Sequence, residues 1–197
     1  MIADPSHHNV VNLTLYVDVH IIDSDHLDVV ELHRLADSDW IALNRTDTLD
    51  TELGTAEPAK RRRLAELSGA YPESYGPMVP GESEPDRSVT ASPQDTARLA
   101  AVSAILFPNL PDLGSARRNH RRDAMHVATA IRYGGHAFIT TEKRPLNKDA
   151  AIRDAFNGFR MWHPRDAVAE TRRRIDTERA LRAAQPHRGP LPLYPPT

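Results

Sequence analysis

The sequence predicts an α/β fold with a mainly parallel central sheet, and two patterns support this. Short segments rich in apolar, β-branched and aromatic residues indicate buried strands, at residues 13–22, 40–43, 136–140 and 159–162. Helical patterns separate these segments, and strands that alternate with helices favour a parallel sheet. With 197 residues, 40% of them hydrophobic and 26% charged, the chain suits one globular domain with extensions.

Asp18 is the anomaly of the first predicted strand, because it interrupts an otherwise apolar run. Aspartate is rarely buried without a partner. It is therefore interpreted as the exposed end of the strand, as a cap of the next helix, or as a metal ligand at the carboxyl end of the strand. Parallel sheets place their sites at that end.

Helices are expected from apolar periodicity, with starts at Ser92-Pro93 and stops at Gly134-Gly135 among the clearest signals. Their predicted ranges are 25–36, 47–67 with a break near Pro58, 92–106, 119–133, 147–156 and 165–184. Residues 69–93 contain five prolines and predict a long loop or a partly disordered insertion. Residues 1–12 form an N-terminal arm, and residues 164–197 a charged helix followed by a proline-rich tail.

Composition excludes several classes of function. The chain has no cysteine, which rules out disulfides, thiolate zinc sites and cysteine nucleophiles and permits a reducing cytoplasm, the expected location. A net charge of −2 gives no overall basic field, so any nucleic-acid binding depends on a local patch. We expect no membrane association, because the start does not resemble a signal peptide and no apolar run approaches the ~20 residues that span a bilayer.

Four acids are candidates for one site: Asp18, Glu52, Asp123 at the start of a helix, and Glu142 just past a strand. Each has an ordinary structural alternative, such as complementing a helix dipole or capping a helix. Carboxylates that share one crevice repel one another unless a cation neutralises them. Oxygen ligands without cysteine favour Mg²⁺ or Mn²⁺, which can activate water and stabilise the charge that develops on a phosphodiester.

Four segments together resemble the PIN-domain family, which includes VapC-like ribonucleases. They are Leu15-Tyr-Val-Asp18, Glu52 on the helix after the second strand, Arg122-Asp-Ala-Met-His-Val-Ala-Thr-Ala130, and Phe138-Ile-Thr-Thr-Glu142. The segment around Asp123 is the most specific. The similarity covers roughly residues 13–163, apart from the proline-rich insertion.

The resemblance implies a three-layer α/β/α fold and a metal-dependent endoribonuclease over residues 13–163. Carried over to this chain, the family's acidic quartet is Asp18, Glu52, Asp123 and Glu142, with Mg²⁺ or Mn²⁺ as cofactor. It also implies RNA as substrate, a homodimer, and a protein antitoxin if the chain belongs to a toxin–antitoxin pair.

Three residues depart from the family pattern. Glu142 stands where aspartate is usual, and its extra methylene moves the carboxylate, which near-octahedral Mg²⁺ tolerates poorly. Arg144 replaces a further acid and would oppose a second metal or contact substrate phosphate. His20 replaces a small polar residue. One-metal activity, an altered metal preference and a degenerate site all remain open.

Basic residues near Asp123 are the candidates for holding RNA. Arg121, Arg122 and Arg144 could contact phosphates if they flank the acids. His126, within a helical turn of Asp123, is interpreted as a packed or hydrogen-bonded histidine rather than a ligand.

Three functions follow from these residues. The first is a metal-dependent endoribonuclease. The second is a catalytically degenerate PIN-like binding or scaffold protein, which the three departures favour. The third is a DNA-directed nuclease, since the metal chemistry does not distinguish the sugar.

Overall fold

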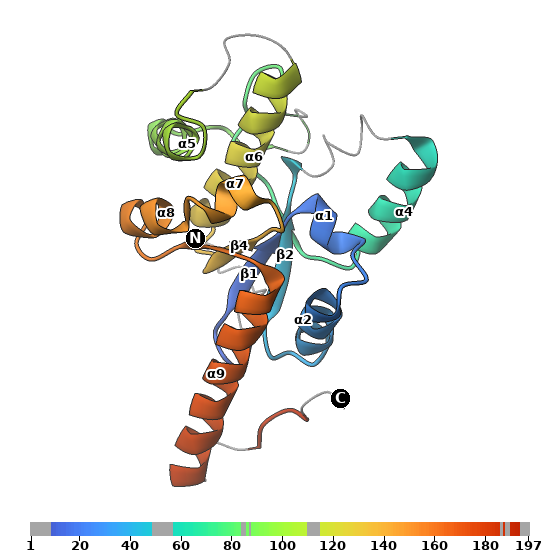
Figure 1. Cartoon of the computed structure of the whole chain (residues 1–197), viewed down its shortest axis with the longest axis vertical. Helices are drawn as coiled ribbons and strands as arrows, with labels where there is room; N and C mark the ends of the chain where they lie inside the picture. The colour runs from blue at the N-terminus through green and yellow to red at the C-terminus, as the bar shows by residue number, and fades with distance from the viewer. Residues whose placement is uncertain are drawn as a thin grey trace.

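The structure is a computed structural model that describes residues 9–48, 57–83, 86, 88–109, 115–185, 187 and 190–193. One or two of the described helices follow each strand along the chain (Figure 1). In chain order they are β1 (Thr14–Val17), α1 (Val19–Ile22), α2 (Leu27–Asp37), β2 (Ala42–Thr46), α4 (Pro58–Ser68), β3 (Glu73–Ser74), α5 (Pro93–Leu106), α6 (Ser115–Arg132), β4 (Ala137–Ile139), α7 (Lys143–Leu146), α8 (Asp149–Ala155), β5 (Arg160–Trp162) and α9 (Pro164–Ala184).

The described strands form one five-stranded sheet in the order β3-β2-β1-β4-β5, and every pair is parallel. The α/β fold expected from the sequence is therefore confirmed, with a sheet that is wholly parallel over the described residues. Leu15 of β1 pairs with Leu43 of β2 on one side and with Ala137 of β4 on the other. β1 is thus a central strand, consistent with its apolar sequence.

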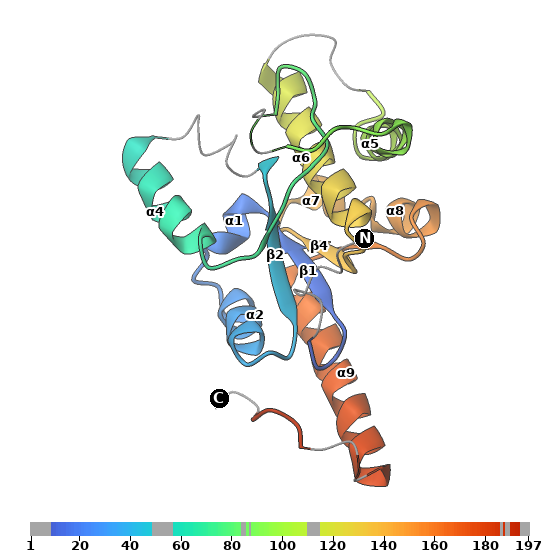
Figure 2. The same cartoon turned by 180° about the vertical axis from the view of Figure 1, so that it is seen from behind.

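Helices cover both faces of the sheet and make three layers (Figures 1 and 2). Side chains alternate along β1, so that Leu15 and Val17 pack into one core and Tyr16 packs into the other. The first core contains apolar residues of α1, α2, α4 and α9, and the second those of α5, α6 and α8. The sheet is buried on both faces, which explains the mostly apolar sequences of its inner strands β1 and β4.

Several elements differ from those predicted. β2 spans Ala42–Thr46 where a strand was predicted at residues 40–43, and the short helix α7 was not predicted. β1 ends at Val17, and Val19 begins α1, where the sequence predicted strand up to residue 22. β3 lies inside the proline-rich segment that was predicted to be a loop, so the sheet has a fifth strand. α6 begins at Ser115, before the predicted start at residue 119.

The start of α5 agrees with the sequence signal. Ser92 accepts a hydrogen bond from the Asp95 amide, and Asp95 accepts one from the Ser92 amide, with Pro93 in the first turn. This reciprocal capping satisfies donors that the first helical turn leaves free.

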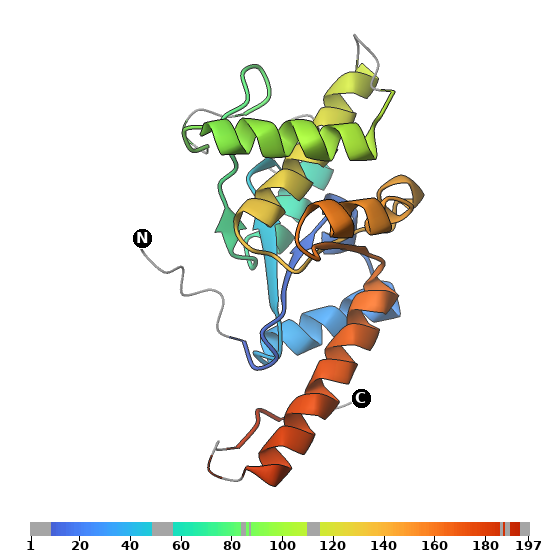
Figure 3. The same ribbon diagram turned by 90° about the vertical axis from the view of Figure 1, so that its left-hand side faces the viewer.

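α9 packs its first half on the sheet and on α2, and its second half extends past the body of the domain (Figure 3). Its buried side chains end at Ile175, and Arg174 anchors it by donating to the Val11 and Asn12 carbonyls at 3.4 and 2.9 Å. The charged helix predicted at residues 165–184 is therefore part of the fold. Among the described helices, none is both long and apolar enough to cross a lipid bilayer.

Candidate functional site

The strand order determines where a site is expected. The chain runs from β1 outward to β2 and β3, then crosses to β4 on the other side of β1. Ligands of open parallel sheets bind outside the carboxyl ends of the strands, where the order reverses. In this sheet that point lies between β1 and β4.

Asp18, Asp123 and Glu142 meet at this point. Asp18 directly follows β1 and keeps its amide bonded to the Ile139 carbonyl of β4, while Glu142 is the residue before α7. The three acids line one narrow crevice, together with Leu106, His126, Val127, Phe138, Thr140 and Pro145. Three segments far apart in the sequence thus bring three of the four predicted acids to one place.

A threonine that the sequence analysis did not single out links two of these acids. The buried Thr140 hydroxyl donates to Asp18 Oδ2 at 2.7 Å, and the Glu142 amide donates to Thr140 Oγ1 at 3.1 Å. Thr140 therefore orients the Asp18 carboxylate and joins the ends of β1 and β4. In the sequence, Thr140 is the last residue of the strand predicted at 136–140 and part of the segment Phe138-Ile-Thr-Thr-Glu142.

The crevice acids are of the chemical type that binds a divalent cation, but they are not closely grouped around one point. Carboxylate oxygens without sulfur are the ligands that Mg²⁺ and Mn²⁺ prefer. Among the described residues, however, no three His, Asp or Glu side chains are grouped so that they could hold a metal ion. Glu52, the fourth predicted acid, lies outside the described residues.

The two other departures from the family pattern lie beside Glu142. His20 Nε2 is 3.9 Å from Glu142 Oε1, and both side chains are about half exposed. Such a contact contributes little in water. Arg144 points elsewhere, because its Nη1 lies 2.6 Å from His120 Nε2.

A larger hollow of about 630 Å³ adjoins the crevice and shares Asp123 and Glu142 with it. Its remaining walls are Val19, His20, Phe107, Asn119, His120, Arg122, Lys143 and Arg144. Acidic and basic side chains therefore line the same hollow. This is the charge pattern expected where a cation and phosphate oxygens meet.

The three predicted RNA-binding arginines are separated. Arg144 is exposed at the rim of the hollow, whereas Arg122 is buried and pairs with Glu82 at 3.3 Å. Arg121 lines a different and smaller groove, between α5, α6 and residues 77–80. The structure therefore brings Arg122 and Arg144, but not Arg121, to the hollow that adjoins the acidic crevice.

His126 is packed and hydrogen-bonded in the way the sequence suggested. Only 2% of its surface is exposed, and its Nδ1 lies 2.5 Å from the Thr46 hydroxyl at the end of β2. It adjoins the buried Asp47, whose pKa is raised by burial and lowered in part by the hydrogen bond from the Gly76 amide and by the charge of His126.

Asp47 belongs to a closed polar cluster rather than to the crevice. Its Oδ1 accepts the Gly76 amide at 2.9 Å. A Cβ on Gly76 would lie 2.5 Å from Thr129 Oγ1 and 2.9 Å from Asp47 Oδ1, so only glycine fits there. From the sequence, Asp47 is predicted in the first turn of a helix, and no local signal indicates its place in this cluster.

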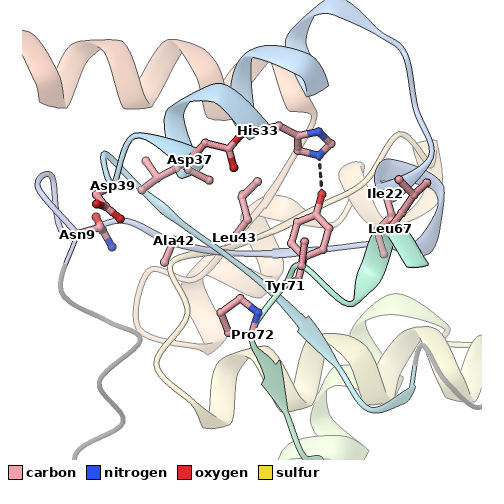
Figure 4. Close-up of a pocket in the computed structure, with 13 residues that line it drawn as sticks. Asn9, Ile22, His33, Asp37, Asp39, Ala42, Leu43, Leu67, Tyr71 and Pro72 are labelled. Carbon is pink, nitrogen blue, oxygen red and sulfur yellow. Dashed lines mark hydrogen bonds between the residues drawn. The ribbon is translucent and has the colours of Figure 1, made fainter. Parts of the chain in front are cut away.

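A separate hollow of about 480 Å³ lies between α2, β2 and the end of α4 (Figure 4). His33 Nε2 and the Tyr71 hydroxyl are 2.5 Å apart there. Burial lowers the pKa of His33, and burial together with the charge of Asp37 raises the pKa of Tyr71 to about 12. Both groups are thus neutral near pH 7, and none of the crevice acids lines this hollow.

Comparisons of the chain with protein-family models, with curated proteins and with solved structures find no match. The relation to the PIN family therefore stays a prediction that rests on the four quoted segments. The parallel sheet and the positions of Asp18, Asp123 and Glu142 rest on the structure itself.

Proposed function

We propose that the chain is a metal-dependent endoribonuclease of the PIN type. One observation carries the proposal: Asp18, Asp123 and Glu142, from three separate segments, line one crevice where the strand order of a parallel sheet reverses. Three carboxylates converge there with arginine and lysine side chains at the rim. This combination supports binding of a divalent cation and of a phosphodiester.

Each residue has a distinct role in the proposal. Asp18, Asp123 and Glu142 would hold Mg²⁺ or Mn²⁺, with Glu52 as the fourth acid implied by the resemblance. The bound ion would lower the pKa of a water molecule and stabilise charge on the phosphate. Thr140 keeps Asp18 aimed into the crevice, and Arg144 and Lys143 supply positive charge for holding the RNA strand.

Metal binding is tested by thermal melts in EDTA and in millimolar Mn²⁺ or Mg²⁺. An ion at 10 to 100 times its Kd should stabilise the native protein by about 1.4 to 2.7 kcal/mol. We expect this shift in the wild type and its loss in Asp123→Asn. Asp154→Asn is the matched control, since Asp154 is an exposed acid of α8 that does not line the crevice and should leave the shift intact.

Cleavage is tested on labelled RNA and on DNA of the same sequence. RNA cleavage that requires Mn²⁺ or Mg²⁺, and that Asp123→Asn loses, supports the proposal. Cleavage retained by Asp123→Asn contradicts the proposal. Preferential cleavage of DNA would instead support the DNA-directed nuclease.

A non-catalytic binding protein is the second candidate, favoured by the absence of a closed three-acid group among the described side chains. This candidate predicts no metal-dependent shift in the thermal melt and no cleavage of RNA, although the protein would still bind a partner. A homodimer and an antitoxin are proposals from the resemblance alone. Light scattering coupled to size exclusion tests the dimer.

A further inference from the structure

Three side chains from three segments form a stacked cluster at the rim of the 630 Å³ hollow. Phe107, at the end of α5, lies parallel to His120 of α6, with ring centroids 4.4 Å apart and planes inclined by 14°. The guanidinium carbon of Arg144, in α7, is 5.7 Å from the Phe107 centroid. Phe107 is only 6% exposed, so it backs the other two.

The hydrogen bond between His120 and Arg144 determines their charges. A guanidinium can only donate, so His120 Nε2 accepts from Arg144 Nη1 at 2.6 Å, and the imidazole carries its proton on Nδ1. Burial and the charge of Arg144 lower the pKa of His120, against the opposing effect of Glu142. Near pH 7 the cluster therefore offers one neutral ring and one planar cation.

The cluster is placed where it can meet a nucleic-acid strand. Arg144 is exposed, and its cavity also contains Asp123 and Glu142 of the acidic crevice. Unpaired bases stack on aromatic rings and on arginine planes, whereas the bases of a duplex are already stacked and enclosed.

We propose that Arg144 and His120, backed by Phe107, form a stacking platform for one unpaired nucleobase next to the acidic crevice. The inference rests on the proposed ribonuclease function and narrows its substrate to single-stranded RNA. Lys143 is the neighbouring exposed cation, and it interacts with the RNA phosphates rather than with the base.

The test measures binding of fluorescently labelled single-stranded RNA in EDTA, so that binding is separated from cleavage. Arg144→Lys keeps the charge and removes the planar group. It should weaken binding roughly 5- to 100-fold, the fold-change of one lost base stack. Lys143→Gln removes a charge beside the platform. It should weaken RNA binding less than Arg144→Lys does, and it should make that binding less dependent on salt.

Abasic substitution identifies the base. Scanning one abasic position along the RNA should reveal a single position where the wild type loses affinity, and that loss should be largely absent in Arg144→Lys. Non-additivity of this kind shows that the base and Arg144 contact each other. Circular-dichroism melts of Arg144→Lys, whose changed side chain is exposed, check that the fold is intact.

The outcomes separate the two proposals. Equal affinity of Arg144→Lys and the wild type, or equal affinity for duplex RNA and single strands, overturns the platform while metal-dependent cleavage still supports the ribonuclease. A wild type that neither binds nor cleaves RNA overturns both.

Discussion

The carboxyl ends of the neighbouring strands β1 and β2 carry the same residue in different surroundings. Asp18 follows β1, is partly exposed, and lines the crevice with Asp123 and Glu142. Asp47 follows β2, is 5% exposed, and accepts a hydrogen bond from the Gly76 amide. An aspartate directly after a parallel strand is therefore not sufficient to make a site.

The exposure of each aspartate depends on the segment that covers the carboxyl end of its strand. After β1 the chain turns into the short helix α1 and leaves Asp18 open, with only the Thr140 hydroxyl donating to its Oδ2 among the bonds described. After β2, residues that follow β3 close over Asp47, with Thr129 of α6 against the same glycine. The open acid can exchange water for a ligand, whereas the closed acid serves the fold.

The largest expected effect is on cleavage. If the proposed metal-dependent RNA cleavage occurs, Asp18→Asn should lower it by about 100-fold, because the variant replaces a charged ligand of the ion by a neutral one. This fold-change corresponds to a loss of ~2.7 kcal/mol of transition-state stabilisation. Asp47→Asn should change cleavage by less than about threefold, since the amide oxygen still accepts from Gly76 and a change below ~0.7 kcal/mol is that small. Single-turnover rates measure both. Equal losses in the two variants would remove the distinction between the open and the closed acid.

The next effect is on stability and concerns the closed acid. Asp47→Ala leaves the buried Gly76 amide without this acceptor, which should cost about 1–3 kcal/mol of unfolding free energy. Asp18→Ala should cost less, because water can replace the carboxylate at an open site. Urea unfolding of the two alanine variants tests the order, and a larger loss for Asp18→Ala would reverse the assignment.

Gly76→Ala tests how tightly the cover over Asp47 is packed. The added methyl group would meet Thr129 Oγ1 and Asp47 Oδ1, and overpacking of this kind costs about 1–3 kcal/mol. The Tm should fall by roughly 2–4 °C for each kcal/mol in a chain of this size. Gly69→Ala is the control, because its Cβ would meet nothing closer than 3.4 Å. A similar Tm for both variants would show that the cover can move aside.

The smallest expected effect is a pH dependence. Burial raises the pKa of Asp47 above its ordinary value of 3.8, so folding favours the protonated form. The stability from this group is present below pH 3.8 and is lost as the pH rises through the raised value. Asp47→Asn does not titrate, and its stability relative to the wild type should therefore rise between pH 4 and pH 7. A constant difference across this range would mean that Asp47 stays charged in the fold.

Local signals were enough for the α/β class and for three acids of the crevice. Ser92, Pro93 and Asp95 mark the start of α5, because the capping contacts lie within a few residues of one another. Asp18 interrupts the first predicted apolar strand and Glu142 lies just past another, and parallel pairing brings the carboxyl ends of such strands to one edge. Both inferences depend on periodicity and on the geometry of parallel sheets.

The features that were missed depend on distant contacts or on weak patterns. Glu73 and Ser74 of β3 have no apolar pattern and become a strand by pairing with Arg45 and Thr46. The β-branched residues of α1 favour a strand locally, yet the chain leaves the sheet after Asp18. The burial of Asp47 requires Gly76 and α6, which its neighbours in the sequence do not indicate.

The C-terminal tail reaches back across the molecule and contacts Trp40. Arg182 donates to the Pro190 carbonyl at 2.9 Å, Leu191 packs against the core, and the indole of Trp40 donates to the Leu193 carbonyl at 3.3 Å. Trp40 is 1% exposed, so its fluorescence reports whether the tail is seated. Removing residues after 184 should shift its emission to longer wavelength as water reaches the ring. The tail thus acts as a strap, and the emission of Trp40 can follow its release in real time once Trp162, the other tryptophan of the chain, is replaced by phenylalanine.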